Sequence, residues 1–501
     1  MKKHLTFPLL FLCALLSAQN ITDVLKYSTE NLQGTARFQS MGGAFGALGG
    51  DLSALNINPA GSAVFNNTLI TISGTYYGTD NDANYFGTRS NTNVDNINMN
   101  QIGGVFVFKS TNADSDWKKF SLGFNYDLVN NFENSYFASG RSNQGVDSYF
   151  LNFAEGTPLG NILLQDGELI ENGYLDIGAN AGFSDQQAFL GYYGGVIDPS
   201  DDDPDTDEYV RNASYTNVDQ QFRRNSIGNN SKFTANIATE YKEKLYLGAS
   251  LNFHSVFNER LDQLTETGYD PNSEIQRITF DNLLTTRGNG FSYSLGAIAK
   301  LNEFVRLGAS YQSPTWYRLN DDFSQRINSN LADEDINFID FGIINLFERY
   351  TIKTPSRLTG SMAVIFGKNG LLSLDYSYQD FSNAELRPQD DPNFRSVNSR
   401  IANELGAVST IRLGGEYRIA QFSLRAGYRY EQSPYANADT IGDLNGISGG
   451  IGYNFGGSRL DFSLNRINQD VNEQLLDTGL VTPITINRVL TNGTLSYTIN
   501  F

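Results

Sequence analysis

Apolar and polar side chains alternate along most of the chain beyond residue 65. Phe120, Leu122 and Phe124, for example, are separated by Ser121 and Gly123. Successive side chains of a β-strand point to opposite faces, so each such stretch predicts a strand with one apolar and one polar face. Fourteen stretches follow this pattern, near residues 66–78, 99–110, 117–131, 231–241, 244–256, 289–300, 304–320, 349–367, 371–381, 407–418, 421–432, 446–455, 458–468 and 486–501.

The connections between the predicted strands alternate in length. Six are tight and seven are long, the longest being residues 132–230. A transmembrane β-barrel of an outer membrane has short periplasmic turns and long outer loops, and its closed sheet leaves no backbone edge unpaired in lipid. A soluble β-sandwich has no reason to keep every second connection short, so we predict an all-β fold, a 14-stranded antiparallel transmembrane β-barrel. The tight connections are Thr111–Asp116, Lys242–Glu243, Leu301–Glu303, Lys368–Gly370, Ile419–Ala420 and Gly456–Gly457.

Aromatic residues near the predicted strand ends fit a membrane barrel. Trp and Tyr collect at the two membrane–water interfaces of such proteins. Tyr76–Tyr77, Tyr311, Trp316–Tyr317 and Tyr428–Tyr430 have this position. The terminal Phe501, on the apolar face of the last strand, is similar to the last residue of outer-membrane barrels.

Composition and charge exclude several other classes of protein. With 36 Lys+Arg against 55 Asp+Glu and no basic block, the chain is not suited to nucleic acid. A single cysteine excludes a disulfide framework, and no apolar run reaches the roughly 18 residues of a transmembrane helix. Residues 1–19 have the basic start, the apolar stretch Leu5–Leu16 and the small-residue end of a secretory signal peptide, with cleavage after Ala18 or Gln19.

Residues 20–63 differ from the rest of the chain because they do not alternate. They are rich in small residues, yet they contain apolar side chains such as Phe38, Phe45 and Leu48, which need burial. A disordered leader has no need of such side chains. We therefore predict that residues 20–63 form a hatch that plugs the lumen, and that residues 64–501 form the barrel.

A glycine-rich run begins at Gly42 and Gly43 and ends at Asp51, and Asn58-Pro59-Ala60-Gly61 follows it. This order resembles the hatch of the FadL/TodX outer-membrane transport proteins, which carries an Asn-Pro-Ala motif. The predicted number of strands is also that of the family. Three later stretches are similar to strands of the same family: Arg306–Pro314, Thr354–Ser356 and Leu424–Pro434.

The resemblance implies passive uptake of hydrophobic small molecules, such as long-chain fatty acids, across the cell outer membrane. In the family, the ligand moves to a pocket and leaves sideways through a gap in the barrel wall. A dry pocket that opens into hydrocarbon spares an apolar solute the aqueous channel. By this resemblance we expect Phe38, Phe45 and Leu48 to line the pocket, with lipid of the outer membrane as the other partner.

The resemblance places the gap in the strand at residues 117–131. Gly123, Asn125 and Asp127 share the inward face of this strand and are the candidate gate residues. Because polar side chains and a glycine weaken pairing, we predict a bulge or bend between Gly123 and Val129. The alternative is an ordinary strand with a polar lumen face.

Other functions are weighed against this one. A secretion-accessory barrel would bind exported proteins at the outer loops, and an unselective porin would need a wide lumen, which a filled hatch opposes. A haem-related receptor would use His254, but a lone histidine at a strand end is more often structural. We expect no enzyme, because His254 has no candidate nucleophile beside it and no nucleotide or zinc motif occurs; no cofactor and no metal site are expected.

The long loop 132–230 has two features of its own. Its apolar stretches Tyr149–Phe153 and Ala188–Tyr193 form either a groove for ligand or the core of a folded loop, and Ser184–Gln187 has the form of a helix-capping box. The acidic run Asp198–Glu208 has the residue type that binds Ca²⁺. Because the spacing and the glycine of an EF-hand are absent, the run favours a solvated loop.

Overall fold

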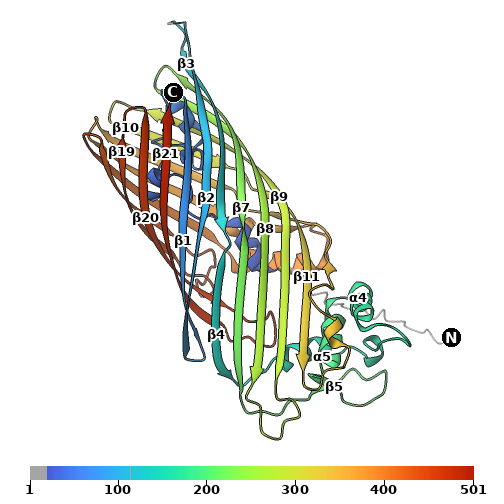
Figure 1. Cartoon of the computed structure of the whole chain (residues 1–501). Coiled ribbons are helices and arrows are strands. Elements are labelled where there is room, and N and C mark those ends of the chain that lie inside the picture. Colours follow the sequence, from blue (N-terminus) through green and yellow to red (C-terminus); the bar gives the residue numbers. More distant parts are fainter. Residues whose placement is uncertain (1–19, 113) are drawn as a thin grey trace, which may run out of the picture.

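A computed structural model describes residues 20–112 and 114–501. The predicted signal peptide, residues 1–19, lies outside the described residues. The strands form a closed antiparallel barrel that tilts around a lumen (Figure 1). β1 (Leu69–Tyr85) closes the sheet by pairing with both β2 (Thr88–Lys109) and β21 (Ile484–Asn500). The predicted 14-stranded transmembrane barrel is confirmed.

Fourteen strand positions follow one another around the wall, and at two of them a proline divides the strand into two shorter strands in line. After β1 and β2 they are β3 (Trp117–Asn131), β7 (Val218–Tyr241), β8 (Leu245–Thr267), β9 (Ile278–Lys300), β10 (Val305–Gln312) with β11 (Trp316–Ser329), β13 (Tyr350–Lys353) with β14 (Arg357–Phe366), β15 (Gly370–Asp380), β17 (Ala407–Ile419), β18 (Phe422–Glu431), β19 (Leu444–Asn454), β20 (Ser458–Glu473) and β21.

Prolines explain the two divided strands. Pro314 separates β10 from β11, and Pro355 separates β13 from β14. Proline has no N–H to donate to a ladder. The two interruptions lie side by side, because the Thr354 N–H donates to the Thr315 carbonyl at 3.0 Å. The sequence pattern had predicted single strands at 304–320 and 349–367, and this detail is wrong.

The two faces of the wall follow the alternation of the sequence. Outward side chains such as Ile72, Phe124 and Leu495 are exposed, whereas the intervening side chains are buried in the lumen. Two predicted interfacial aromatics are exceptions. Tyr77 and Tyr317 point inward and are buried, because each hydroxyl forms hydrogen bonds inside the barrel.

The outer connections are shorter than the sequence predicted. β1 and β2 continue to a turn at Phe86–Gly87, so the expected first long loop is absent among the described residues. Likewise, β4 (Asn134–Ser142) pairs with the start of β7, so strands occupy both ends of the predicted loop 132–230. The tight turns lie at the opposite end of the barrel, as predicted.

A folded outer cap, residues 143–217, covers the outer end of β7–β11. Phe150, Phe189 and Leu190 are completely buried in it, so the folded-loop alternative is correct for both apolar stretches. The capping-box prediction is wrong: the helix begins at Phe183 after Gly182, and no side chain caps it. The cap contains α3 (Asp147–Ala154), η3 (Leu159–Asn161), α4 (Ile170–Asn180), α5 (Phe183–Tyr193), β5 (Ile197–Pro199) and β6 (Tyr209–Arg211).

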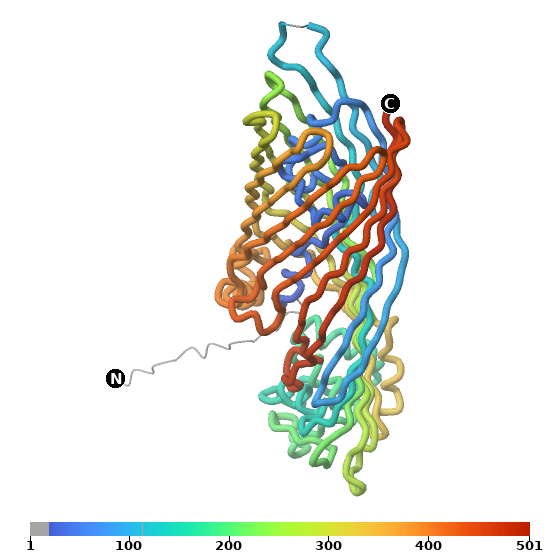
Figure 2. Tube along the Cα trace, turned by 90° about the vertical axis from the view of Figure 1, so that its left-hand side faces the viewer, coloured from blue at the N-terminus to red at the C-terminus, as the bar shows by residue number. Residues whose placement is uncertain are grey.

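The remaining elements lie in the hatch and in other outer connections. None of the helices described for residues 20–112 and 114–501 is both long and apolar enough to cross a membrane. The outer connections hold η4 (Ile336–Phe338), β12 (Asn345–Leu346), η5 (Phe381–Asn383), β16 (Glu385–Arg387) and α6 (Pro392–Glu404). The hatch consists of α1 (Ile21–Ser28), α2 (Ala36–Ser40), η1 (Leu52–Asn56) and η2 (Pro59–Val64), and Figure 2 shows its blue trace inside the barrel.

Candidate functional site

The Asn-Pro-Ala motif holds the hatch against the barrel wall. The Asn58 Nδ2 donates to the carbonyl of Ala297 on β9 at 3.0 Å and to the carbonyl of Gly46 in the hatch at 2.8 Å. Its Oδ1 accepts from the Ala60 N–H at 3.1 Å, which caps η2. Two strands away, the Asn236 Nδ2 of β7 donates to the Pro59 carbonyl at 2.9 Å. One asparagine therefore joins both halves of the hatch to the wall.

Glycines on the inward face of the wall make room for the hatch. A Cβ at Gly296 would lie 2.0 Å from the Asn58 Oδ1, and a Cβ at Gly427 would lie 2.2 Å from the Gly42 nitrogen. The same close approach occurs at Gly248, Gly308 and Gly414. The sequence analysis did not single out these glycines, although a glycine on the polar face of an alternating strand is a usable signal.

The hatch motif also has its own glycine requirements. Gly42 and Gly43 have φ of +61° and +76°, in the left-handed region that favours glycine. Gly61 packs on Gly49, where an added Cβ would lie 3.2 Å from the Gly49 Cα. These residues shape the hatch backbone, and the structure places none of them in the lining of the cavity described below.

Buried charges join the hatch to the wall near its periplasmic end. The Arg37 Nε lies 2.9 Å from Glu416 of β17, and Glu416 also lies 2.7 Å from Arg425 of β18. Arg425 in turn lies 2.7 Å from Asp461 of β20. All four side chains are at most 7% exposed. Breaking a buried pair of this kind leaves an uncompensated charge, so the network resists removal of the hatch.

A cavity of about 40 Å³ lies between the hatch and the wall. Phe38 lines it, whereas Phe45 and Leu48 pack with Met41 in an apolar cluster outside its lining. The volume of the cavity is far below the roughly 300–1,000 Å³ of a pocket for a drug-sized ligand. The complete lining is Glu30, Asn31, Leu32, Gln33, Phe38, Asn56, Ile57, Leu128, Val129, Lys232, Arg357, Arg412 and Arg429.

The cavity combines an apolar side with an excess of positive charge. Lys232, Arg357, Arg412 and Arg429 line it together with one carboxylate, Glu30. Arg357 donates to Glu30 at 2.7 Å.

The other two arginines approach the cavity from neighbouring strands. The Arg412 Nη1 donates to the Ser377 Oγ at 3.0 Å, and an Arg429 Nη2 donates to Glu431 at 2.7 Å. The Arg429 Nε is buried without a hydrogen-bond partner among the described residues. An anionic group fits this arrangement because charge-assisted hydrogen bonds are the stronger ones.

β3 is distorted where it lines the cavity. Its pairing with β7 shifts between Leu128 and Asn130, at the outer end of the predicted range 123–129, so the bulge is confirmed there. The Val129 carbonyl accepts from the Asn31 N–H of the hatch at 3.2 Å instead of from a neighbouring strand. Both Leu128 and Val129 are buried, which breaks the alternation of faces.

The β2–β3 ladder ends just before this bulge. Its last pair is Gln101 with Asp127, and the outer part of β2 pairs only with β1. Side chains connect the outer part of β2 to the residues that follow the bulge. The Asn131 Nδ2 donates to the Asn96 Oδ1 at 3.1 Å, and the Ser90 Oγ donates to the Phe137 carbonyl at 2.5 Å. We call this boundary, between residues 88–100 and residues 128–142, the seam.

The candidate gate residues lie just below the seam. Gly123 and Asn125 belong to the regular ladder, paired with Val105 and Gly103. Asp127 is buried and accepts hydrogen bonds from Asn125 and from Asn56 of the hatch, the latter at 2.6 Å. The polar face of β3 therefore binds the hatch.

Two other candidates from the sequence form hydrogen bonds with neighbouring protein groups. The Nδ1 of His254 lies 3.0 Å from the Tyr317 hydroxyl inside the barrel. Asp201 and Asp203 in the acidic run accept hydrogen bonds from neighbouring backbone N–H groups. In the described part of the chain, no group of three or more His, Cys, Asp or Glu side chains is placed to hold a metal ion.

The sequence also matches a known protein family. The profile of the outer membrane protein transport protein family (OMPP1/FadL/TodX) matches residues 209–474 of the 501. The chain belongs to this family. It is therefore an outer-membrane β-barrel of a family that transports hydrophobic compounds through channels.

One solved structure shares the fold, and two others are similar to the chain. A FadL homologue of Pseudomonas aeruginosa is 14% identical, covers 95% of this chain and 100% of its own, and superposes with a TM-score of 0.54. The toluene transporter TodX of Pseudomonas putida is also 14% identical, with coverage of 95% and 100% and a TM-score of 0.49. The toluene transporter TbuX of Ralstonia pickettii is 14% identical, with coverage of 94% and 99% and a TM-score of 0.47. No curated protein matches the sequence.

Proposed function

We propose that this protein carries hydrophobic molecules with an acidic group, such as long-chain fatty acids, passively across the outer membrane and without chemical conversion. The observation that carries the proposal is the cavity beside the hatch, which Phe38 and Leu32 line together with Arg412 and Arg429. An aliphatic chain would contact the apolar side, and a carboxylate would pair with the arginines. A plain hydrocarbon would bring no negative charge to Arg412, which donates a hydrogen bond to the uncharged Ser377 hydroxyl.

The proposed route uses the hatch, residues 20–63, as a unit separate from the barrel, residues 64–501. Because the cavity of about 40 Å³ is far smaller than the roughly 300–1,000 Å³ of a ligand pocket, a ligand must displace the hatch segment Glu30–Gln33 that lines it. Leu128 and Val129 line the cavity and also adjoin the seam. We place the lateral exit there, with Asp127 at its lower edge, rather than at Gly123 or Asn125.

A binding experiment tests the choice of ligand. Purified protein in detergent is titrated with a radiolabelled long-chain fatty acid and with the alcohol of the same chain length. Wild-type protein should bind the acid at least tenfold more tightly, because a hydrogen bond to a charged group contributes about 1.5–3 kcal/mol. Arg412→Gln should weaken binding of the acid about tenfold and leave binding of the alcohol unchanged.

Arg488→Gln is the matched control. Arg488 is tied to Glu473 at 3.2 Å and does not line the cavity, so its loss should change neither affinity. Equal affinity of the wild-type protein for acid and alcohol would reject the acidic ligand and leave an uncharged hydrophobic compound as the substrate.

A further inference from the structure

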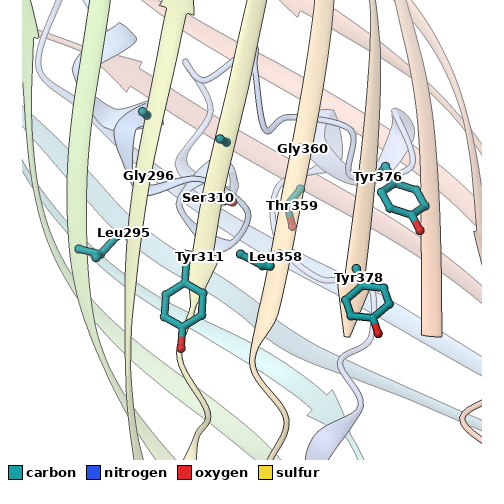
Figure 3. Close-up of a pocket in the computed structure, with 11 residues that line it drawn as sticks. Leu295, Gly296, Ser310, Tyr311, Leu358, Thr359, Gly360, Tyr376 and Tyr378 are labelled. Atoms are coloured by element: carbon teal, nitrogen blue, oxygen red, sulfur yellow. The ribbon is translucent and has the colours of Figure 1, made fainter. Parts of the chain in front are cut away.

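The lipid-facing surface of the barrel carries a groove with a volume of about 540 Å³, unrelated to the lumen (Figure 3). It crosses four adjacent strands, β9, β10, β14 and β15. Its floor consists of Ala297, Ala309 and Gly360. Ala309 pairs directly with both of the others, so the floor is one row of small residues across three strands.

Large side chains enclose this row. The adjacent row of lipid-facing side chains, on the side toward the outer loops, is large. It consists of Leu295, Tyr311, Leu358 and Tyr378, each on a residue paired with the next. Tyr376, which pairs with Gly360, closes the end of the floor. Leu358 and Tyr376 are 57% and 47% exposed, so they stand out from the wall and give the groove its depth.

Gly360 is not required by the protein itself. A Cβ at this position would meet no atom within 4 Å, and Gly360 is absent from the residues with positive φ. Glycine weakens the interior of a strand and often marks a place where another molecule approaches closely. By contrast, a Cβ at Gly415, in another outward row of small residues, would lie 3.1 Å from the Leu372 side chain. The space over Gly360 is therefore open to an external molecule.

We propose that the groove binds an acyl chain of an outer-leaflet lipid. The surroundings of the wall are hydrocarbon, and the floor and the leucines offer an apolar surface of matching chemistry. The hydroxyls of Tyr311 and Tyr378 point away from Gly360 in Figure 3, toward the outer end of their strands. They are placed to donate hydrogen bonds to the ester carbonyls of the lipid, as interfacial tyrosines do.

Photo-crosslinking tests this site in the full-length mature protein. The protein is reconstituted in phospholipid vesicles that contain a trace of phosphatidylethanolamine with a diazirine in its acyl chain. After illumination, mass spectrometry should locate crosslinks in residues 295–312 and 357–378 at several times their frequency in other lipid-facing strands. Gly360→Leu places a large side chain in the groove, at a position where an added Cβ meets no protein atom within 4 Å, and should reduce these crosslinks at least fivefold.

The control variant is Ala426→Leu, which adds the same bulk beside Gly415, where the neighbouring side chain already covers the row. It should leave the crosslinks unchanged, and heat-modified gel mobility should verify that both variants are folded. Crosslinks that are spread evenly over the lipid-facing strands, or that Gly360→Leu does not reduce, would overturn the proposal. Crosslinks between two protein chains at the groove would also overturn it, in favour of a second copy.

Discussion

Replacing Glu416 with glutamine tests whether charge holds the hatch in the lumen. The Glu416 carboxylate accepts hydrogen bonds from Arg37 at 2.9 and 3.5 Å. Glutamine keeps the shape of the side chain and removes its charge. Arg37 would then retain Asp51 at 4.0 Å and the Gly50 carbonyl at 3.0 Å, and both of these residues belong to the hatch itself. The ionic contact between Arg37 and the wall is lost.

The size of the effect follows from the number of charged contacts. A hydrogen bond to a charged group contributes about 1.5–3 kcal/mol. Because the amide of glutamine still accepts one weaker bond, we expect a loss of about 2–3 kcal/mol for the closed hatch. Since about 1.4 kcal/mol corresponds to a factor of ten, the population with a displaced hatch should rise about 30- to 150-fold.

Single-channel recording in planar bilayers measures this population. Glu416→Gln should show brief openings that are rare in the wild-type protein, and deletion of Gly42–Gly50 should conduct permanently. Arg400→Gln is the negative control, because the exposed pair Arg400–Glu404 on α6 contributes only about 0.3–0.5 kcal/mol. If the deletion conducts while Glu416→Gln remains as closed as the wild type, the ionic network does not hold the hatch.

Three further predictions concern topology, exit and the hatch seat. An epitope tag within Asp198–Glu208 should be labelled on intact cells, and a tag at Lys368–Gly370 should not. The reverse pattern would show that the barrel has the opposite orientation in the membrane. A disulfide from Asn96→Cys with Asn131→Cys should stop uptake of a labelled fatty acid by cells lacking their own transporter, whereas a disulfide at the ladder pair Phe106 and Leu122 should not. Uptake that continues with the seam locked would exclude lateral exit there. Gly296→Val should lower the free energy of unfolding by about 1–3 kcal/mol in chemical denaturation, because its Cβ would overlap Asn58. Gly360→Val should have little effect. Equal effects of the two substitutions would refute the close contact between Gly296 and the hatch.

The sequence predicts the strands well only where the barrel faces lipid. There, outward residues such as Ile70 and Ile72 must be apolar, and the alternation is visible. Beyond the bilayer, β1 and β2 continue through the polar residues 79–98 with their pairing intact. Because both faces of this extension can be polar, its sequence does not alternate between apolar and polar residues. The sequence therefore indicated a long loop, and this interpretation is wrong.

The cavity is harder to predict than the wall. Alternation assigns Lys232, Arg357, Arg412 and Arg429 to the lumen, but each belongs to a different strand. Whether they meet depends on the stagger of neighbouring strands, which is set by the turns and by the divided strands at Pro314 and Pro355. Alternation within one strand does not give this stagger. The burial of Phe38, Phe45 and Leu48 was predictable because apolar side chains in a hatch need it, but this reasoning does not distinguish Phe38, which lines the cavity, from the other two.

The bulge of β3 has its cause outside the strand. Gly123, Asn125 and Asp127 are the residues that weaken pairing by composition, yet their ladder with β2 is regular. The distortion instead begins at Leu128, where the Val129 carbonyl and the Asn130 side chain bind residues 29–31 of the hatch. A backbone carbonyl that accepts a hydrogen bond from the hatch is not available to pair with a neighbouring strand of the wall. The hatch that closes the lumen therefore also opens the ladder at the seam, and displacement of residues 29–31 by a ligand would change both at once.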